Sequence, residues 1–267
     1  MNPRRVFAVV LRQLYLMKGS ASRLLPIFVW VAVDMALWGF LTRYLSAVAV
    51  SRVSFSVVFL GAIFFWDVFN RIMVGVSMAF FEDVWSRNFL NFFSTPLSVS
   101  EYLAGLILTS LAAGGAGIAV MLALGSAAFG FSISNYGLAA GPFLITMVLF
   151  GVALGTTAAA MVLRLGPAAE WFAWAMPAVL SPFAGVFYPV SLLPGWMRFF
   201  SKFLPPSYVF EALRRIVGGQ RPGVAGLAAG GALAVVDVLL AGAFFAWVWR
   251  YAMKTGLLAR YSAESVS

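Results

Sequence analysis

The chain has 267 residues, of which 63% are hydrophobic and only 10% are charged, with 18 Lys and Arg, nine Asp and Glu, and no His or Cys. Ordinary soluble domains carry roughly 25% charged residues, so the composition excludes that class and is typical of an integral membrane protein. The missing Cys excludes disulfides and thiol nucleophiles, and the missing His removes the commonest general base.

Residues 3–18 are too short and too charged to cross a bilayer. Their apolar residues recur at helical spacing, at Phe7, Val10, Leu11, Leu14 and Met17. Arg5 and Arg12 lie on another face. The pattern predicts a helix lying in the membrane surface, with its arginines toward the lipid headgroups. Residues 1–23 then form an interfacial unit, which serves either as an anchor only or also as an elbow that touches a cytosolic partner.

Six apolar stretches follow, and each approaches the roughly 20 residues that a helix needs to cross a bilayer. They cover about 24–45, 55–80, 103–130, 137–162, 171–188 and 224–249. The expected fold is an all-α membrane domain of six spans over 24–250, followed by a cytosolic tail over 251–267. Glycines spaced by four, at 137/141, 151/155 and 226/230, suit helix packing within one subunit at least as well as a subunit interface.

Several predicted spans contain charged or polar residues: Asp34, Asp67, Asn70, Arg71 and Asp237. A charge at the bilayer centre costs roughly 2.5–3.5 kcal/mol, so these side chains are expected to face other helices or a polar path. Asp67 and Arg71 share one helix face. They form either a salt bridge that helps helices pack, or part of a substrate path. Asp34 and Asp237 must find partners on other helices or lie near water, unless burial keeps them protonated.

The segment between the second and third spans interleaves polar and aromatic residues. Glu82, Asp83 and Arg87 alternate with Trp85 and other apolar residues. This predicts a short amphipathic helix over about 82–92, which ends near Pro96 because proline disfavours helix at the residue before it. The helix either rests on the membrane surface or docks into a groove of a soluble partner.

Prolines interrupt the apolar stretch before the last span, at Pro189, Pro194, Pro205 and Pro206. The pieces 195–203 and 207–217 are each too short to cross a bilayer. Irregular backbone at membrane depth needs cover from protein or a water-filled cavity, so residues 189–217 are expected to form re-entrant half-helices on the outer side. Their basic residues are expected to reach the outer headgroups: Arg198, Lys202, Arg214 and Arg215.

The positive charges cluster beside the predicted spans, which indicates orientation and contact with anionic lipids rather than nucleic-acid binding. Lys and Arg are more numerous on the inner side when the N-terminus is inside. Both termini are therefore expected in the cytoplasm.

Two motifs carry a resemblance to a known family. The first is Glu82 followed by Ser94-Thr95-Pro96-Leu97-Ser98, Glu101 and Gly105. The second precedes the last span and comprises Tyr188-Pro189, Leu193-Pro194, Leu204-Pro205-Pro206, Glu211-Ala212 and Arg214. With these motifs and six predicted spans, the chain resembles the type-2 permeases of ATP-binding-cassette (ABC) exporters.

The resemblance implies roles for the two regions. The coupling region, which docks on an ATPase subunit, would contain Glu82, Asp83, Trp85 and Arg87. The external gate would contain Pro189, Pro194, Trp196, Pro205, Tyr208 and Arg214. The ion pair Asp67–Arg71 maps onto no general family motif. The resemblance also implies two permease copies, a homodimer being expected, with two ATPases in a bacterial inner membrane.

The sequence contains no G-x-x-x-x-G-K-[S/T] loop, so ATP and Mg²⁺ are expected on a separate subunit and no cofactor is expected in this chain. The leading hypothesis is a non-enzymatic permease subunit that exports an amphipathic, lipid-like, glycan or drug-like substrate by alternating access. An alternative is an ion- or proton-coupled carrier that uses Asp34, Asp67 and Asp237. A membrane enzyme is disfavoured, since no nucleophile–histidine pair is possible and no metal cluster stands out.

Overall fold

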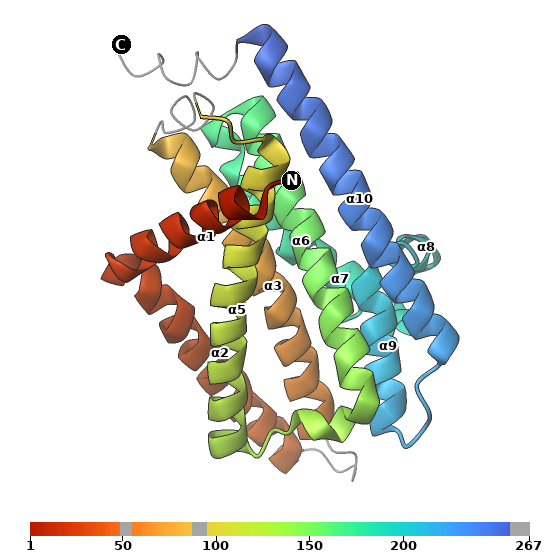
Figure 1. The fold of residues 1–267 in the computed structure, drawn as a ribbon. Helices are drawn as coiled ribbons and strands as arrows, with labels where there is room; N and C mark the ends of the chain where they lie inside the picture. Colours follow the sequence, from red (N-terminus) through yellow and green to blue (C-terminus); the bar gives the residue numbers. More distant parts are fainter. Residues whose placement is uncertain (49–54, 87–94, 257–267) are drawn as a thin grey trace.

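The computed structural model describes residues 1–48, 55–86 and 95–256, and every regular element in these ranges is helical (Figure 1). The α-helices are α1 Pro3–Lys18, α2 Ala21–Val48, α3 Phe55–Trp85, α5 Val99–Phe129, α6 Ala140–Leu165, α7 Trp171–Ala184, α8 Gly195–Ser201, α9 Pro205–Val217 and α10 Val224–Thr255. Short 3₁₀ turns join some of them: η1 Ile133–Ala139, η2 Pro167–Glu170 and η3 Val190–Leu192. The all-α prediction is confirmed.

Among the described residues, five helices are long and apolar enough to cross a membrane. They cover Arg23–Val48, Val57–Trp85, Val99–Phe129, Ile133–Leu165 and Val224–Thr255. The remaining predicted span, 171–188, corresponds to α7, which has only 14 residues. At 1.5 Å per residue such a helix is about 21 Å long, shorter than the roughly 30 Å hydrocarbon core. The six-span count is therefore not confirmed.

The directions of the long helices show how the chain nevertheless traverses the bundle. Gly151 of α6 packs on Phe69 of α3 and Gly155 packs on Met73, so α3 and α6 are parallel. Contacts at both ends of α6 make α10 parallel to it as well. The chain between α6 and α10 must therefore return across the bundle. It does so in pieces, through α7, η3, α8 and α9 (Figure 1).

Glycines set the closest helix contacts. A Cβ atom added at Gly155 would lie 2.7 Å from the carbonyl oxygen of Met73, and one at Gly151 would lie 2.8 Å from that of Phe69. Any larger residue would push α3 and α6 apart. By contrast, a Cβ added at Gly141 meets nothing within 4 Å. The 151/155 pair thus serves packing within the subunit, as one reading of the sequence predicted.

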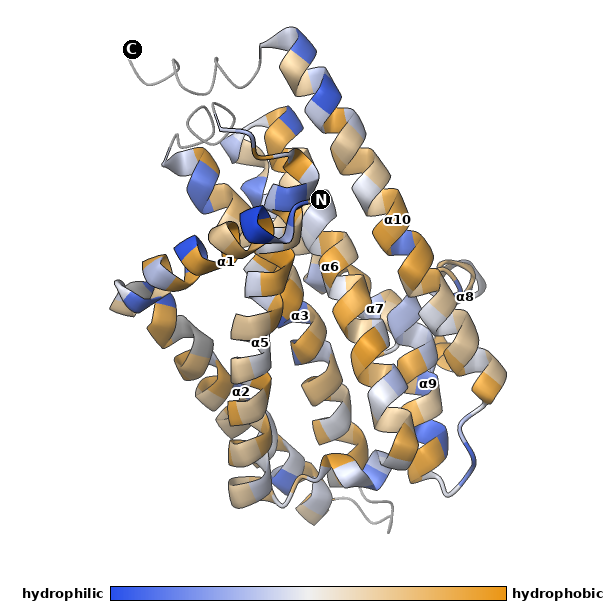
Figure 2. Cartoon of the chain, viewed as in Figure 1, coloured by the Kyte–Doolittle hydropathy of each residue, from blue (hydrophilic) through white to orange (hydrophobic). Residues whose placement is uncertain are grey.

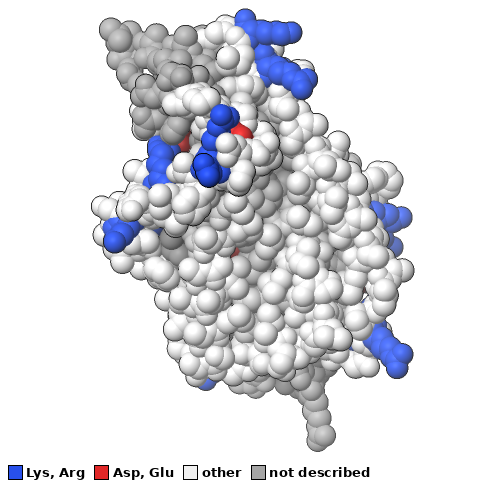
Figure 3. Space-filling model, in the orientation of Figure 1, with Lys and Arg blue, Asp and Glu red and all other residues white. Residues whose placement is uncertain are grey.

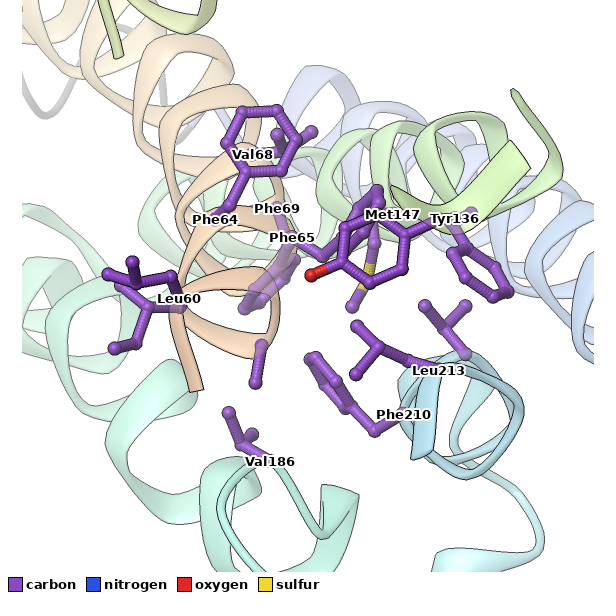
Figure 4. Close-up of a cluster of buried hydrophobic side chains, with 14 of the residues drawn as sticks. Leu60, Phe64, Phe65, Val68, Phe69, Tyr136, Met147, Val186, Phe210 and Leu213 are labelled. Atoms are coloured by element: carbon purple, nitrogen blue, oxygen red, sulfur yellow. The ribbon is translucent and has the colours of Figure 1, made fainter. Parts of the chain in front are cut away.

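The segment from α7 to α9, residues 171–217, is called here the broken passage. An apolar cluster packs it against the long helices (Figure 4). Phe65 of α3 faces Phe210 and Leu213 of α9 in this cluster, and all three side chains are fully buried. Val186, just after α7, joins the same cluster. Within a bilayer, lipid tails are as apolar as these side chains, so close packing rather than the hydrophobic effect stabilises the contact.

The outer faces of the bundle are largely apolar (Figure 2). Large exposed hydrophobic residues follow α2 and α10, among them Trp30, Leu37, Phe40, Leu239 and Leu240. Basic side chains gather near α1 and the end of α10, and others lie toward the opposite end, with a broad band of uncharged surface between them (Figure 3). This arrangement suits a membrane protein whose uncharged middle band contacts the hydrocarbon core of the bilayer.

Candidate functional site

Helix α1 lies across one end of the bundle and packs on the start of α5. Val6 and Val9 are buried there. A Cβ added at Gly105 would lie 2.5 Å from the Cγ1 of Val9, so the missing side chain lets the helices approach. Phe7 and Leu14 are 64% and 43% exposed, which leaves the predicted apolar face of α1 available to a membrane surface.

Asp83, near the end of α3, is buried beneath α1 and is 1% exposed. Arg12 of α1 donates to both of its oxygens, at 2.6 Å to Oδ1 and 3.2 Å to Oδ2. The hydroxyl of Tyr102 on α5 donates to Oδ2 at 2.7 Å, and Gln13 Nε2 lies at 3.5 Å. The prediction that Arg12 faces the headgroups is wrong, because a buried carboxylate from another helix binds its guanidinium.

Glu101, in the first turn of α5, forms a second link to α1. Its Oε1 accepts from the backbone N–H of Asn2 at 2.6 Å. Its Oε2 accepts from the N–H of Ser98 at 3.0 Å, while the Ser98 hydroxyl accepts from the Glu101 N–H at 3.3 Å, which completes a capping box. Arg5 Nη1 lies 3.5 Å from the same carboxylate. One residue thus starts α5 and holds the N-terminus of α1.

The remaining predicted coupling residues lie nearer the surface. Glu82 forms an ion pair with Arg23 of α2, with Oε1 and Nε 3.3 Å apart. Trp85 is 48% exposed at the end of α3. Arg87 and most of the predicted 82–92 helix lie outside the described residues. Of the predicted group, Trp85 and Glu82 are therefore accessible to a partner, whereas Asp83 is not.

A second ionic group lies within the bundle, between α2, α3 and α5. Asp67 and Arg71 form the predicted ion pair on α3, and their side chains are only 14% and 12% exposed. Asp34 of α2 interacts electrostatically with both. A Cβ added at Gly117 of α5 would lie 3.3 Å from the Arg71 Nη1, so this glycine makes room for the guanidinium. Asp34 is thus influenced by the positive charge of Arg71 on the neighbouring helix.

The other predicted intramembrane polar residues are not part of this group. Asn70 is half-buried beside it on α3. Asp237, midway along α10, is half-buried and lines a cavity of about 330 Å³ between α6, α7 and α10. Apart from Asp237 and Thr157, the cavity walls are apolar. Asp237 makes no hydrogen bond or ion pair within the parts of the chain that the structure describes.

In the broken passage, Arg214 and Glu211 of α9 hold the turn after α7. Arg214 Nη1 donates to the carbonyl oxygen of Gly185 at 2.8 Å, and its Nη2 donates to Glu211 Oε1 at 2.9 Å. The same Glu211 oxygen accepts from the N–H of Val190 at 2.8 Å. The prediction that Arg214 reaches the outer headgroups is wrong, since its side chain is 16% exposed and bound inside the protein.

Prolines interrupt this part of the chain, as the sequence predicted, and they stand at the starts of its short helices. Pro189 and Pro194 precede η3 and α8 with extended backbone angles, and Pro205 opens α9. Proline fits a first helical turn because the N–H it lacks would be unsatisfied there. Trp196 is 61% exposed, and the Tyr208 hydroxyl donates to the carbonyl oxygen of Lys202 at 2.9 Å, closing the α8–α9 turn.

The sequence profile of the ABC-2 type transporter family matches residues 4–217, from α1 to α9. This chain belongs to the ABC-2 type transporter family. Both the charged end and the broken passage of this permease lie within the matched residues, whereas α10 follows them. A comparison with curated proteins gives no match.

Sequence reasoning missed Gln13 and Tyr102, and it missed the contacts that Arg12 and Glu101 make at the end of the bundle that carries α1, called here the charged end. The spacing Ser98-x-x-Glu101 was a readable signal for a capping box. The partnership of Arg12 with Asp83 was not readable, because the residues are 71 positions apart. Together, Asp83 and Glu101 hold α1 to the end of α3 and the start of α5, the two ends of the connection predicted to meet an ATPase.

Proposed function

We propose that this permease is the membrane half of an ATP-driven exporter whose ATPase subunit docks at the end of the bundle that carries α1. The family match supports this assignment. The observation that supports this docking site is that Asp83 and Glu101 bind α1 through hydrogen bonds. A docked subunit that moves the connection between α3 and α5 would then move α1 with both helices.

Within the docking region, the described side chains divide into two roles. Trp85 and Glu82 are accessible and would contact the ATPase. Asp83 is buried, so it would transmit the movement by holding Arg12 and Tyr102 rather than by touching the partner. Arg87 stays a predicted contact residue. Lys and Arg near α1 and the end of α10 support a cytoplasmic location for this end.

Export would follow from alternating access between two permease copies, which together form the path. The exposed apolar residues of α2 leave room for a second copy or for lipid. The broken passage would act as the external gate, because Arg214, Glu211 and Gly185 join its pieces through a few hydrogen bonds rather than one continuous helix. An amphipathic substrate suits a path bordered by apolar helices with a few ionic groups.

Docking can be tested by co-expressing the permease with a candidate ABC ATPase from the same genome and measuring co-purification, ATP hydrolysis and transport in proteoliposomes. Trp85→Ala and Glu82→Ala are expected to reduce co-purification and transport while the permease still folds. Leu138→Ala is the control, since Leu138 is 98% exposed in η1, at the start of α6 and so at the opposite end of the bundle. Normal docking and transport by both test variants would refute the proposed contact.

The same preparation separates the exporter from the alternative carrier. An exporter stops when ATP is withdrawn or when the ATPase is inactivated. Transport that continues without ATP and follows an imposed pH gradient would instead favour a carrier that uses the intramembrane carboxylates.

A further inference from the structure

A cavity of about 370 Å³ lies between α8, α9 and the start of α10. Its lining includes three basic residues, Arg198, Lys202 and Arg215, together with Ser201 and Glu211. One side of its lining is the start of α10, which begins at the end of the bundle opposite α1 (Figure 1). Basic side chains mark this edge of the molecule in Figure 3.

The basic side chains are poorly compensated by the protein. Lys202 and Arg215 make no side-chain hydrogen bond or ion pair with any residue in 1–48, 55–86 or 95–256. Within the same described residues, Arg198 donates only to neutral backbone carbonyls, those of Ser191 at 2.6 Å and Leu193 at 3.1 Å. Among the residues that the structure describes, these three positive charges therefore line one cavity without an acidic partner of their own.

The one acidic residue of the lining does not offset them. Glu211 accepts from Arg214 at 2.9 Å and from the backbone N–H of Val190 at 2.8 Å. Its charge is thus matched by an arginine that does not line the cavity. The net charge facing the cavity remains positive, which favours an anionic occupant.

A buried hydroxyl gives an independent indication of a ligand. Ser201 lines the cavity and is 1% exposed, yet its Oγ has no hydrogen-bond partner within the described structure. Buried polar groups are nearly always satisfied, so an unpaired one calls for a partner from outside the protein. A hydroxyl donor beside Lys and Arg matches the oxygens of a phosphate group.

The adjoining cavity indicates what the phosphate is attached to. Lys202 lines the basic cavity, whereas the next two residues, Phe203 and Leu204, line the apolar cavity of about 330 Å³ beside α10. Apart from Thr157 and Asp237, the lining of this second cavity is apolar. A molecule with an anionic head and a hydrocarbon chain would place one part in each.

We propose that the α8–α9–α10 cavity binds the phosphate headgroup of an anionic membrane amphiphile, with Arg198, Lys202, Arg215 and the Ser201 hydroxyl around the phosphate oxygens and a hydrocarbon chain beside Phe203 and Leu204. All the residues of this site belong to one subunit. Its occupancy requires neither the ATPase nor a second copy, so it stands apart from the docking proposal.

The test measures binding to the purified permease in detergent with three probes: dioctanoyl phosphatidylglycerol, dioctanoyl phosphatidylcholine and inorganic phosphate. We expect phosphatidylglycerol to bind and to raise the melting temperature more than the other two. Arg215→Gln and Lys202→Gln are each expected to weaken this binding about tenfold or more, since each removes a charge-assisted hydrogen bond. Both side chains are exposed, so the variants should fold.

Arg221→Gln is the matched control, because it removes the same charge from the neighbouring exposed loop without touching the cavity. Equal weakening by Arg221→Gln would show a general charge effect and overturn the site. Equal binding of the two lipids would overturn headgroup recognition, and inorganic phosphate binding as tightly as phosphatidylglycerol would overturn the amphiphile. Ser201→Ala tests the hydroxyl separately, because it should weaken phosphatidylglycerol binding without altering the charge of the cavity.

Discussion

Asp83→Asn tests whether a buried carboxylate holds α1 to α3 and α5. Asparagine has nearly the same shape, but it replaces an acceptor-only group by one that also carries donors, which would meet the donors of Arg12. Breaking a buried ion pair costs about 3–5 kcal/mol. The Arg12 side chain is 28% exposed and regains some water, so we expect a loss of about 3 kcal/mol in the free energy of unfolding.

The measurement is a double-mutant cycle of Asp83→Asn and Arg12→Gln, with unfolding in mixed detergent micelles followed by circular dichroism. We expect a coupling energy of about 2 kcal/mol, within the range for residues in one ion-pair network. Tyr102→Phe should cost about 1.5–3 kcal/mol, because it removes a hydrogen bond to a charged group. A coupling energy below about 0.5 kcal/mol would show that the contact does not hold α1 in place.

Other positions give further tests. Gly155→Ala should destabilise the permease by about 1–3 kcal/mol because the new methyl group meets the α3 backbone. Gly141→Ala should be neutral or stabilising. Equal effects of the two changes on chemical unfolding would contradict the close packing of α3 and α6. Arg71→Gln should reduce stability and transport more than Asp67→Asn, since Arg71 serves two carboxylates; the reverse order would count against a shared cation. Gly185→Ala should cost about 1–3 kcal/mol because Gly185 has φ +63° and a Cβ there would lie 3.0 Å from a carbonyl oxygen; an unchanged melting temperature would exclude strain at this turn.

The features that depend on nearby residues were predictable from the sequence. The Asp67–Arg71 pair followed from helical spacing, and the short helices α8 and α9 followed from their prolines. The length of α7 was not predicted. Its residues are as apolar as those of a span, but Gly185 turns the chain in a left-handed conformation and ends the helix early.

The features that depend on distant residues could not be predicted. Hydrophobic periodicity assigned the arginines of α1 to the headgroups, because nothing local to Arg12 reveals a carboxylate on α3. Burial of Asp83 likewise depends on α1 covering it. The roles of the coupling and gate residues remain predictions that transport measurements can test.

The contacts of Asp83 and Glu101 with α1, here called the clasp, have a thermodynamic consequence for the end of α3 and the start of α5. Because Arg12 and Asn2 bind these two carboxylates, the two helix ends are held in place before another protein binds, and less conformational entropy is lost on binding. Cutting this clasp should therefore slow assembly with the ATPase even where every residue at the contact surface is intact.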